Sequence, residues 1–251
     1  MEFISDWLSW QVLLLFSIGL LAAIVGMMFG AAGFILLPSL LLVGIPIHAT
    51  VAANKFATGI SSFTTVLTLV QQKRISWRDM LPFVLLASFG GVLGAYIATR
   101  LSEQTMNIIA CIVLVFMFLY TLQQANKTAT RQRAKPNRFT SFFIAVYDGG
   151  IGPGSGLLNI TYFLRLQHSY QKAAEMTRFV MFASCATAFA FYYVSGVVAW
   201  HVAIPVAAGS IIGSQIGLRL IPYLKGALIQ KLFPVVVLVL IMQVIWRMWH
   251  G

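Results

Sequence analysis

The sequence predicts an all-α polytopic membrane protein, and three observations carry that prediction. Apolar residues make up 59% of the 251 residues and charged residues only 9%, and the mean hydropathy is +0.87. Several uncharged runs approach the ~20 residues that a helix needs to cross a bilayer. These runs are continuously apolar, whereas the strands of a membrane barrel alternate apolar and polar side chains. We therefore expect helices to cross the membrane.

The predicted helices follow one another along the whole chain. A long apolar run at 7–29 comes first, and Glu2 and Asp6 precede it where a secretory signal would carry basic residues. We interpret this run as a retained segment, not as a cleaved signal peptide. The clearest spans after it are 80–99, 105–122, 179–195, 202–218 and 232–246.

The chain matches itself at a fixed offset, since Gly26 is matched by Gly149 (149 − 26 = 123) and the register holds to about Leu101. Glycine, proline and tryptophan, which have specific backbone and interfacial roles, recur among the matches. We therefore predict two homologous halves, a first transmembrane repeat at 1–125 and a second at 139–251. The residues between them, 126–138, form a basic linker that is predicted to be cytoplasmic. Further matched pairs are Gly33 with Gly156, Lys55 with Arg178, Trp77 with Trp200, Pro82 with Pro205 and Gly94 with Gly217.

Each half is predicted to hold a glycine-interrupted pair of segments followed by three transmembrane helices, about eight transmembrane segments in total. The pairs are 7–29 with 33–43, and 139–148 with 156–166. A helix of ten to twelve residues is about 15–18 Å long and too short to cross alone. Each pair is therefore one broken helix that crosses once, or a re-entrant hairpin. If both pairs are hairpins, the basic loop residues lie on the same side of the membrane as the basic linker, except Arg100 and Arg247. The positive-inside rule therefore favours hairpins, and with them inverted repeats.

The two interruptions are the predicted binding site. The stretch that starts at Gly149 reads GGIGPGSG, and its partner that starts at Gly26 reads GMMFGAAG. Non-helical backbone at membrane depth is tolerated only inside protein or beside a watery cavity. Each stretch precedes a helix N-terminus, whose amide groups and partial positive charge suit an anion. The candidate backbone positions are Gly30, Gly33, Gly152, Gly154 and Gly156.

Two cations at equivalent positions of the repeats strengthen this prediction. Lys55 and Arg178 lie about two turns into otherwise apolar helices, where an ionisable side chain is costly and indicates function. Asp148 and Glu175 are the acidic residues near the site and the candidates for proton coupling. The pattern predicts a small anionic ligand. Further hydrogen-bonding candidates are Asn54, Thr177, Ser155 and Asn159.

Other classes of function fit the sequence poorly. The six acidic residues, four histidines and two cysteines form no metal-ligand spacing and no catalytic triad, so we predict no enzyme, no cofactor and no metal site. The net charge is +11, but the basic residues flank apolar runs and are not interleaved with aromatic residues on a soluble face. This distribution argues against nucleic acid as a partner. The expected partners are the lipid bilayer and a small anionic substrate. Glycine-rich faces such as 90–94 also allow a homodimer.

A family resemblance follows from the two repeated patterns. They read GMMFGAAGFILLPSLLLVGIPIHATVAANKFATGISS in the first half and YDGGIGPGSGLLNITYFLRLQHSYQKAAEMTRFVMFASC in the second. From Leu20 to Lys225 the chain resembles the TauE/SafE family of membrane anion exporters. The resemblance implies a multi-pass secondary transporter that exports sulfite, sulfoacetate or another C2 organosulfonate across the cytoplasmic (inner) membrane. We expect alternating access; an anion-selective channel and a non-transporting membrane subunit are the alternatives.

Overall fold

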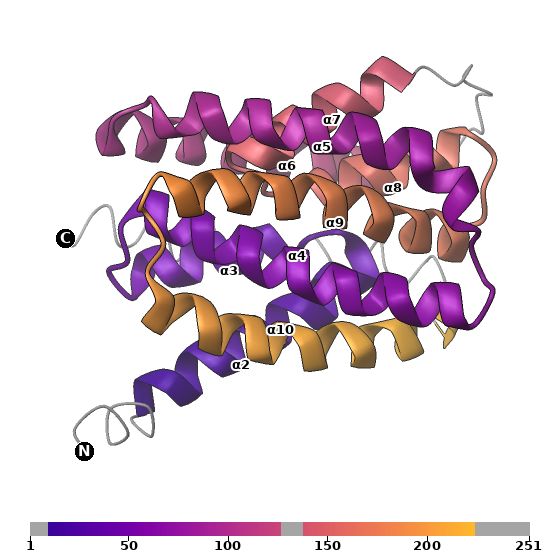
Figure 1. Ribbon diagram of the computed structural model, residues 1–251, viewed down its shortest axis with the longest axis horizontal. Coiled ribbons are helices and arrows are strands. Elements are labelled where there is room, and N and C mark those ends of the chain that lie inside the picture. The colour runs from indigo at the N-terminus through magenta and orange to yellow at the C-terminus, as the bar shows by residue number, and fades with distance from the viewer. Residues whose placement is uncertain (1–9, 127–137, 224–251) are drawn as a thin grey trace.

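The structure, a computed structural model, describes residues 10–126 and 138–223 (Figure 1). Within these ranges the chain is helical and has no strand, which confirms the all-α prediction for this part. The elements are α2 (Trp10–Phe29), α3 (Ala32–Leu42), α4 (Ile47–Gln71), α5 (Trp77–Thr99), α6 (Glu103–Asn126), α7 (Arg138–Gly150), α8 (Ser155–Arg165), α9 (Tyr170–Val194), α10 (Trp200–Leu220) and the 3-10 helix η1 (Ile221–Tyr223).

Four of the described helices, α2, α5, α9 and α10, are long and apolar enough to cross a membrane. The predicted spans 80–99, 105–122 and 202–218 lie inside α5, α6 and α10. Helix α9 begins earlier than the predicted 179, because the Ser169 hydroxyl caps it by accepting a hydrogen bond from the amide of Lys172. Residues 127–137 of the predicted linker and the predicted span 232–246 lie outside the described residues.

The helix boundaries follow the offset found in the sequence. Helices α3 and α8, α4 and α9, and α5 and α10 start 123 residues apart (155 − 32, 170 − 47 and 200 − 77). Packing also has the same pattern in both halves, since α2 lies on α10 of the other half and α7 lies on α5. Likewise, α5 packs on α9 and its equivalent α10 packs on α4.

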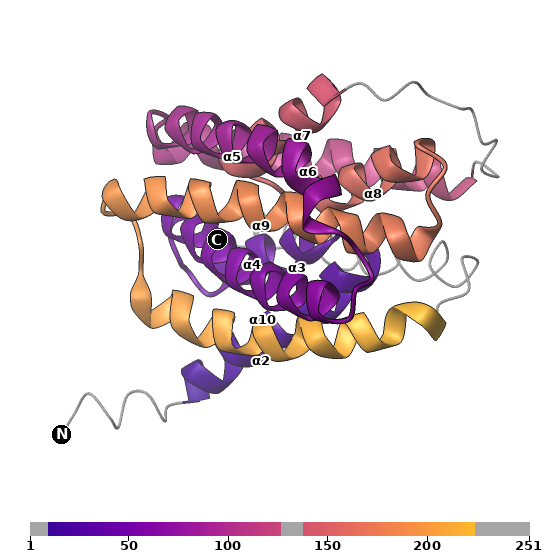
Figure 2. The same cartoon turned by 45° about the vertical axis from the view of Figure 1, so that its right-hand side comes forward.

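Equivalent helices of the two halves run in opposite directions. Helices α4 and α9 lie side by side at the centre and are antiparallel (Figures 1 and 2). Their ring contacts give the same direction, because Phe56 meets Phe189 at 4.7 Å and Phe63 meets Phe182 at 5.2 Å between centroids. The views show the same reversal for α5 and α10.

The short helices turn back on the segments before them. Helix α3 runs opposite to α2 in both views, so the interruption at Gly30 is the tip of a hairpin (Figures 1 and 2). Gly30 has φ +73°, a left-handed conformation that ends α2 and that L side chains rarely adopt. Helices α7 and α8 flank the second interruption, where Gly152 and Gly154 have φ +86° and +78°.

Small residues bring the outer helices close together. Gly209 and Gly213 of α10 lie directly against the backbone of α2, and Gly90 and Gly94 of α5 lie against the backbone of α7. Such contacts are the usual means of packing helices tightly in a membrane, where lipid offers no hydrophobic drive for association. The glycine-rich face 90–94 is therefore buried against α7 and α9 of the same chain.

Candidate anion-binding site

The two helix interruptions contact each other inside the protein. The amide of Leu157, in the first turn of α8, donates a hydrogen bond of 3.1 Å to the carbonyl oxygen of Gly30. A Cβ placed on Gly30 would overlap the backbone of Gly156 and Leu157, and one placed on Gly156 would overlap Gly30. This contact uses one of the N-terminal amides that the sequence suggested would face a ligand.

Lys55 lies at the second interruption, in a buried ion pair with Asp148. The distance from Lys55 Nζ to Asp148 Oδ1 is 3.1 Å, and each residue is 1% exposed. The Ser155 hydroxyl donates to the same oxygen over 2.6 Å, and the hydroxyl of Ser184 and the thiol of Cys185 donate to Oδ2. We call Lys55, Asp148, Gly152 and Ser155 the Lys55 half-site.

Removal of Lys55 alone should destabilise the protein strongly. The Lys55→Met substitution leaves a carboxylate buried without its cation, which costs about 3–5 kcal/mol. Thermal unfolding of the purified protein should show a large fall in the midpoint. The matched variant Lys55→Met/Asp148→Asn removes both charges and should recover most of the loss. If the double variant lost as much stability as Lys55→Met does, the ion pair with Asp148 would not be what stabilises Lys55 in the interior.

Arg178 lies at the first interruption and is 4% exposed. Its Nη2 donates a hydrogen bond of 2.7 Å to the carbonyl oxygen of Gly26, and its Nε is buried without a hydrogen-bond partner. Among the ion pairs of the described residues, none includes Arg178. The Tyr170 hydroxyl donates to the nearby carbonyl of Met28. We call Arg178, Gly26 and Tyr170 the Arg178 half-site.

The two cations lie on opposite sides of the α4–α9 crossing. Gly59 faces Cys185 and Ala186 across that crossing. Lys55 comes one turn before Gly59 and Arg178 two turns before Cys185, so in these antiparallel helices they are about 16 Å apart along the axis. The structure therefore does not bring them together at one point. Instead, each cation contacts the interruption of the other half.

The other predicted residues have varied positions. Asn54 accepts a hydrogen bond from Thr58, and Thr177 donates to the carbonyl of Ala173 within its own helix. Asn159 is 1% exposed and its Oδ1 has no hydrogen-bond partner. Gly33 packs on Pro153, so it belongs to the contact between the interruptions.

Glu175 pairs with neither of the two buried cations. Although the i, i+3 spacing suggested that it could pair with Arg178, it forms an ion pair with Arg74, at the end of α4, and accepts a hydrogen bond from Gln171. This ion pair joins the first half to the second at the end of the crossing that is nearer Arg178. Glu175 therefore lies at one end of the helix pair, where Arg74 is partly exposed.

Sequence reasoning missed Ser184 and Cys185 as partners of Asp148. Ser184 and its equivalent Ser61 were expected among the hydrogen-bonding neighbours of the site, but not as partners of Asp148, and Cys185, alone in an apolar run, was expected only to pack. No local signal could have linked them to a carboxylate 36 and 37 residues away in the chain.

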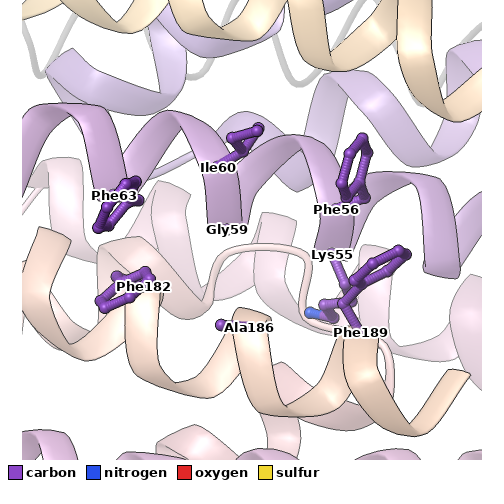
Figure 3. A pocket seen from close by; sticks show the side chains of 8 residues that line it. All are labelled: Lys55, Phe56, Gly59, Ile60, Phe63, Phe182, Ala186 and Phe189. Carbon is purple, nitrogen blue, oxygen red and sulfur yellow. The ribbon is translucent and has the colours of Figure 1, made fainter. Parts of the chain in front are cut away.

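An apolar pocket of about 210 Å³ lies between α4 and α9 (Figure 3). The Lys55 side chain reaches it from α4, and phenyl rings of both helices surround it. Only carbon atoms are exposed in it, and the Lys55 ammonium is directed to Asp148 instead. Its lining residues are Lys55, Phe56, Gly59, Ile60, Phe63, Phe182, Ala186 and Phe189.

Membrane-length helices, paired interruptions and buried cations define an integral membrane protein of the transporter class. The chain belongs to the Sulfite exporter TauE/SafE family, whose profile matches residues 15–244. It is 30% identical over 231 residues to the "Probable membrane transporter protein ORF9" of Sinorhizobium sp, covering 90% of this chain and 87% of that protein. It is 25% identical over 214 residues to a "Probable membrane transporter protein" of Haemophilus influenzae, covering 83% and 84%. No solved structure gives a significant match.

Proposed function

We propose that this family member is a secondary transporter that exports a small sulfur oxyanion or a C2 organosulfonate, such as sulfite or sulfoacetate, across the cytoplasmic membrane. The observation that carries the proposal is the contact between the two helix interruptions, with one buried cation at each. The halves, 1–125 and 139–251, act as inverted repeats, and the antiparallel run of α4 and α9 supports this arrangement.

The charges favour an anion as the transported species. Asp148 pairs with Lys55, and the buried Glu175 pairs with Arg74, which leaves Arg178 as a buried positive charge without an ion-pair partner among the described residues. A buried charge is costly unless it is paired, and a small oxyanion pairs with a guanidinium through two parallel hydrogen bonds. The buried Nε of Arg178, which has no partner, is available for such a bond.

Alternating access follows from the way the halves interlock. Each cation contacts the interruption of the other half. When one half rocks against the other, one half-site therefore opens while the other closes. Lys73, Arg74 and Arg78 lie at the Arg178 end of the α4–α9 pair, which the positive-inside rule assigns to the cytoplasm. The Arg178 half-site therefore takes up the anion, and the Lys55 half-site releases it.

Counterflow in proteoliposomes tests this function. Vesicles loaded with unlabelled sulfite should transiently accumulate labelled sulfite above its external concentration, because a carrier exchanges the two. Empty vesicles without protein are the control. Uptake that only approaches equilibrium would indicate a channel, and no protein-dependent flux of sulfite or sulfoacetate would leave the non-transporting subunit as the explanation.

A further inference from the structure

The two half-sites differ in charge, because only the Lys55 half-site contains a carboxylate. In the Lys55 half-site the ammonium contacts Asp148, whereas the equivalent position of the first half is Val25 (148 − 123 = 25). Arg178 accordingly has no carboxylate within ion-pair distance among the described residues. The carboxylate is therefore a feature of the Lys55 half-site that the Arg178 half-site lacks.

The donors around Asp148 Oδ1 have the composition of an anion-binding site. They are an ammonium group from α4 and the Ser155 hydroxyl from the first residue of α8. Gly152 leaves room for them, because a Cβ at that position would overlap both Lys55 Nζ and Asp148. The carbon chain of Lys55 also lines the apolar pocket between α4 and α9 (Figure 3). A ligand anion would find the same donors that Asp148 now occupies.

The two oxygens of the carboxylate have separate partners. Oδ1 accepts from Lys55 and Ser155, which lie on α4 and α8, whereas Oδ2 accepts from Ser184 and Cys185, both on α9. Asp148 can therefore release the first two donors and remain hydrogen-bonded to α9 through Oδ2. A carboxylate held in this way moves without being left wholly unpartnered in the protein interior.

We propose that Asp148 is an internal anion that holds the Lys55 half-site between transport events, and that the transported anion displaces it from Lys55 and Ser155. The inference rests on the proposed function and assigns Asp148 a part in it. When Asp148 returns to Lys55, it replaces the anion and releases it. The steps exchange hydrogen bonds and one ion pair, and no covalent bond changes.

The proposal sets the charge that the site accepts. With the carboxylate of Asp148 present, Lys55, Arg178 and Asp148 together carry one net positive charge. With a neutral amide in place of the carboxylate, the same three positions carry two positive charges. The Asp148→Asn substitution should therefore strengthen anion binding, since no competitor remains, and should strengthen it more for a dianion. A carboxylate that only stabilises Lys55 has no reason to alter this preference.

Calorimetric titration of the purified protein tests the inference with methanesulfonate, a monoanion, and sulfoacetate, a dianion with the same sulfonate group. Asp148→Asn should bind sulfoacetate about tenfold more tightly than the parent does, with a smaller gain for methanesulfonate. An Asp148→Asn protein whose affinities equal or fall below those of the parent would overturn the proposal, as would equal gains for the two probes.

A second measurement does not depend on the folding of Asp148→Asn. Infrared difference spectra of the parent, with methanesulfonate minus without, should show a shift of a carboxylate stretching band as Asp148 leaves Lys55, because this probe has no carboxylate of its own. The Lys55→Met/Asp148→Asn variant, in which both charges are absent, should lack that band. A parent spectrum whose protein carboxylate bands do not change on binding would contradict the displacement.

Measurements on the parent protein distinguish a wrong role for Asp148 from a wrong proposed function. If the parent binds and exchanges sulfoacetate while Asp148→Asn shows no tighter binding, then the role of Asp148 is wrong and the proposed function stands. If neither protein binds or transports any of the anions, then the proposed function itself is wrong, and the inference falls with it.

Discussion

Gly30→Ala should prevent the two interruptions from meeting and should abolish transport. Its Cβ would enter the backbone of Gly156 and Leu157, in a conformation with φ +73° that already costs an L residue about 1–2 kcal/mol. Overpacking against rigid backbone adds about 1–3 kcal/mol, because no side chain can turn aside. We expect thermal unfolding to show a combined loss of about 3 kcal/mol and vesicle assays to show no flux.

Gly196→Ala is the matched control for that result. Gly196 has nearly the same backbone conformation, φ +72°, but nothing lies within 4 Å of the position of its Cβ. The variant therefore carries the conformational strain without the clash, and should lose about 1 kcal/mol and transport normally. If Gly30→Ala and Gly196→Ala behave alike, then the contact between the interruptions is not needed.

Arg178→Gln should lower the rate of anion transport about 100-fold. The change removes the buried cation without an ion-pair partner and its unpartnered Nε, and a hydrogen bond to a charged group contributes about 1.5–3 kcal/mol. Arg178→Lys keeps the charge but loses the planar fork, so we expect a loss of about tenfold. Initial rates of labelled sulfite uptake at equal protein density measure both.

Two controls guard this interpretation. Arg100→Gln removes a cation that lies over the ring of Tyr96 at the end of α5, far along the chain from the interruptions, and should leave flux within about twofold of the parent. Thermal unfolding of Arg178→Gln should show a protein that remains folded, since no carboxylate loses its partner. Parent rates from a folded Arg178→Gln protein would remove Arg178 from the site.

The helix pattern could be predicted from the sequence because its signals are local. Glycine at Gly30 and Gly152, apolar runs of membrane length and the paired tryptophans Trp77 and Trp200 all act within a few residues of chain. The repeat offset placed Lys55 and Arg178 at equivalent positions, and both are buried beside an interruption. The apolar span at 179–195 covered only the later part of α9, because the first turns of that helix are polar and lower the local hydropathy.

The partners of those cations could not be predicted, because they come from the other half. A repeat offset says which residues are equivalent but not which helices pack together. Spacing along one helix suggested Glu175 for Arg178, yet the tertiary fold places Glu175 against Arg74. Likewise, Lys55 and Asp148 are 93 residues apart, and their contact follows only from the packing of α7 on the first half.

The separation of the cations is also a product of the tertiary structure. The sequence predicted a cradle in which Lys55 and Arg178 act together. Because α4 and α9 are antiparallel, residues at equivalent positions move apart on opposite sides of the crossing. This geometry replaces one shared cradle with two half-sites that are linked through the Gly30–Gly156 contact.

Diffraction from crystals soaked in selenite, an analogue of sulfite with a selenium anomalous signal, tests the central claim most directly. The account predicts an anomalous peak in the protein interior, within hydrogen-bond distance of the Arg178 guanidinium or of Lys55 with Asp148 displaced. A structure whose selenium peaks lie only beside surface residues such as Arg165 and Arg219, with both half-sites unchanged, would contradict it.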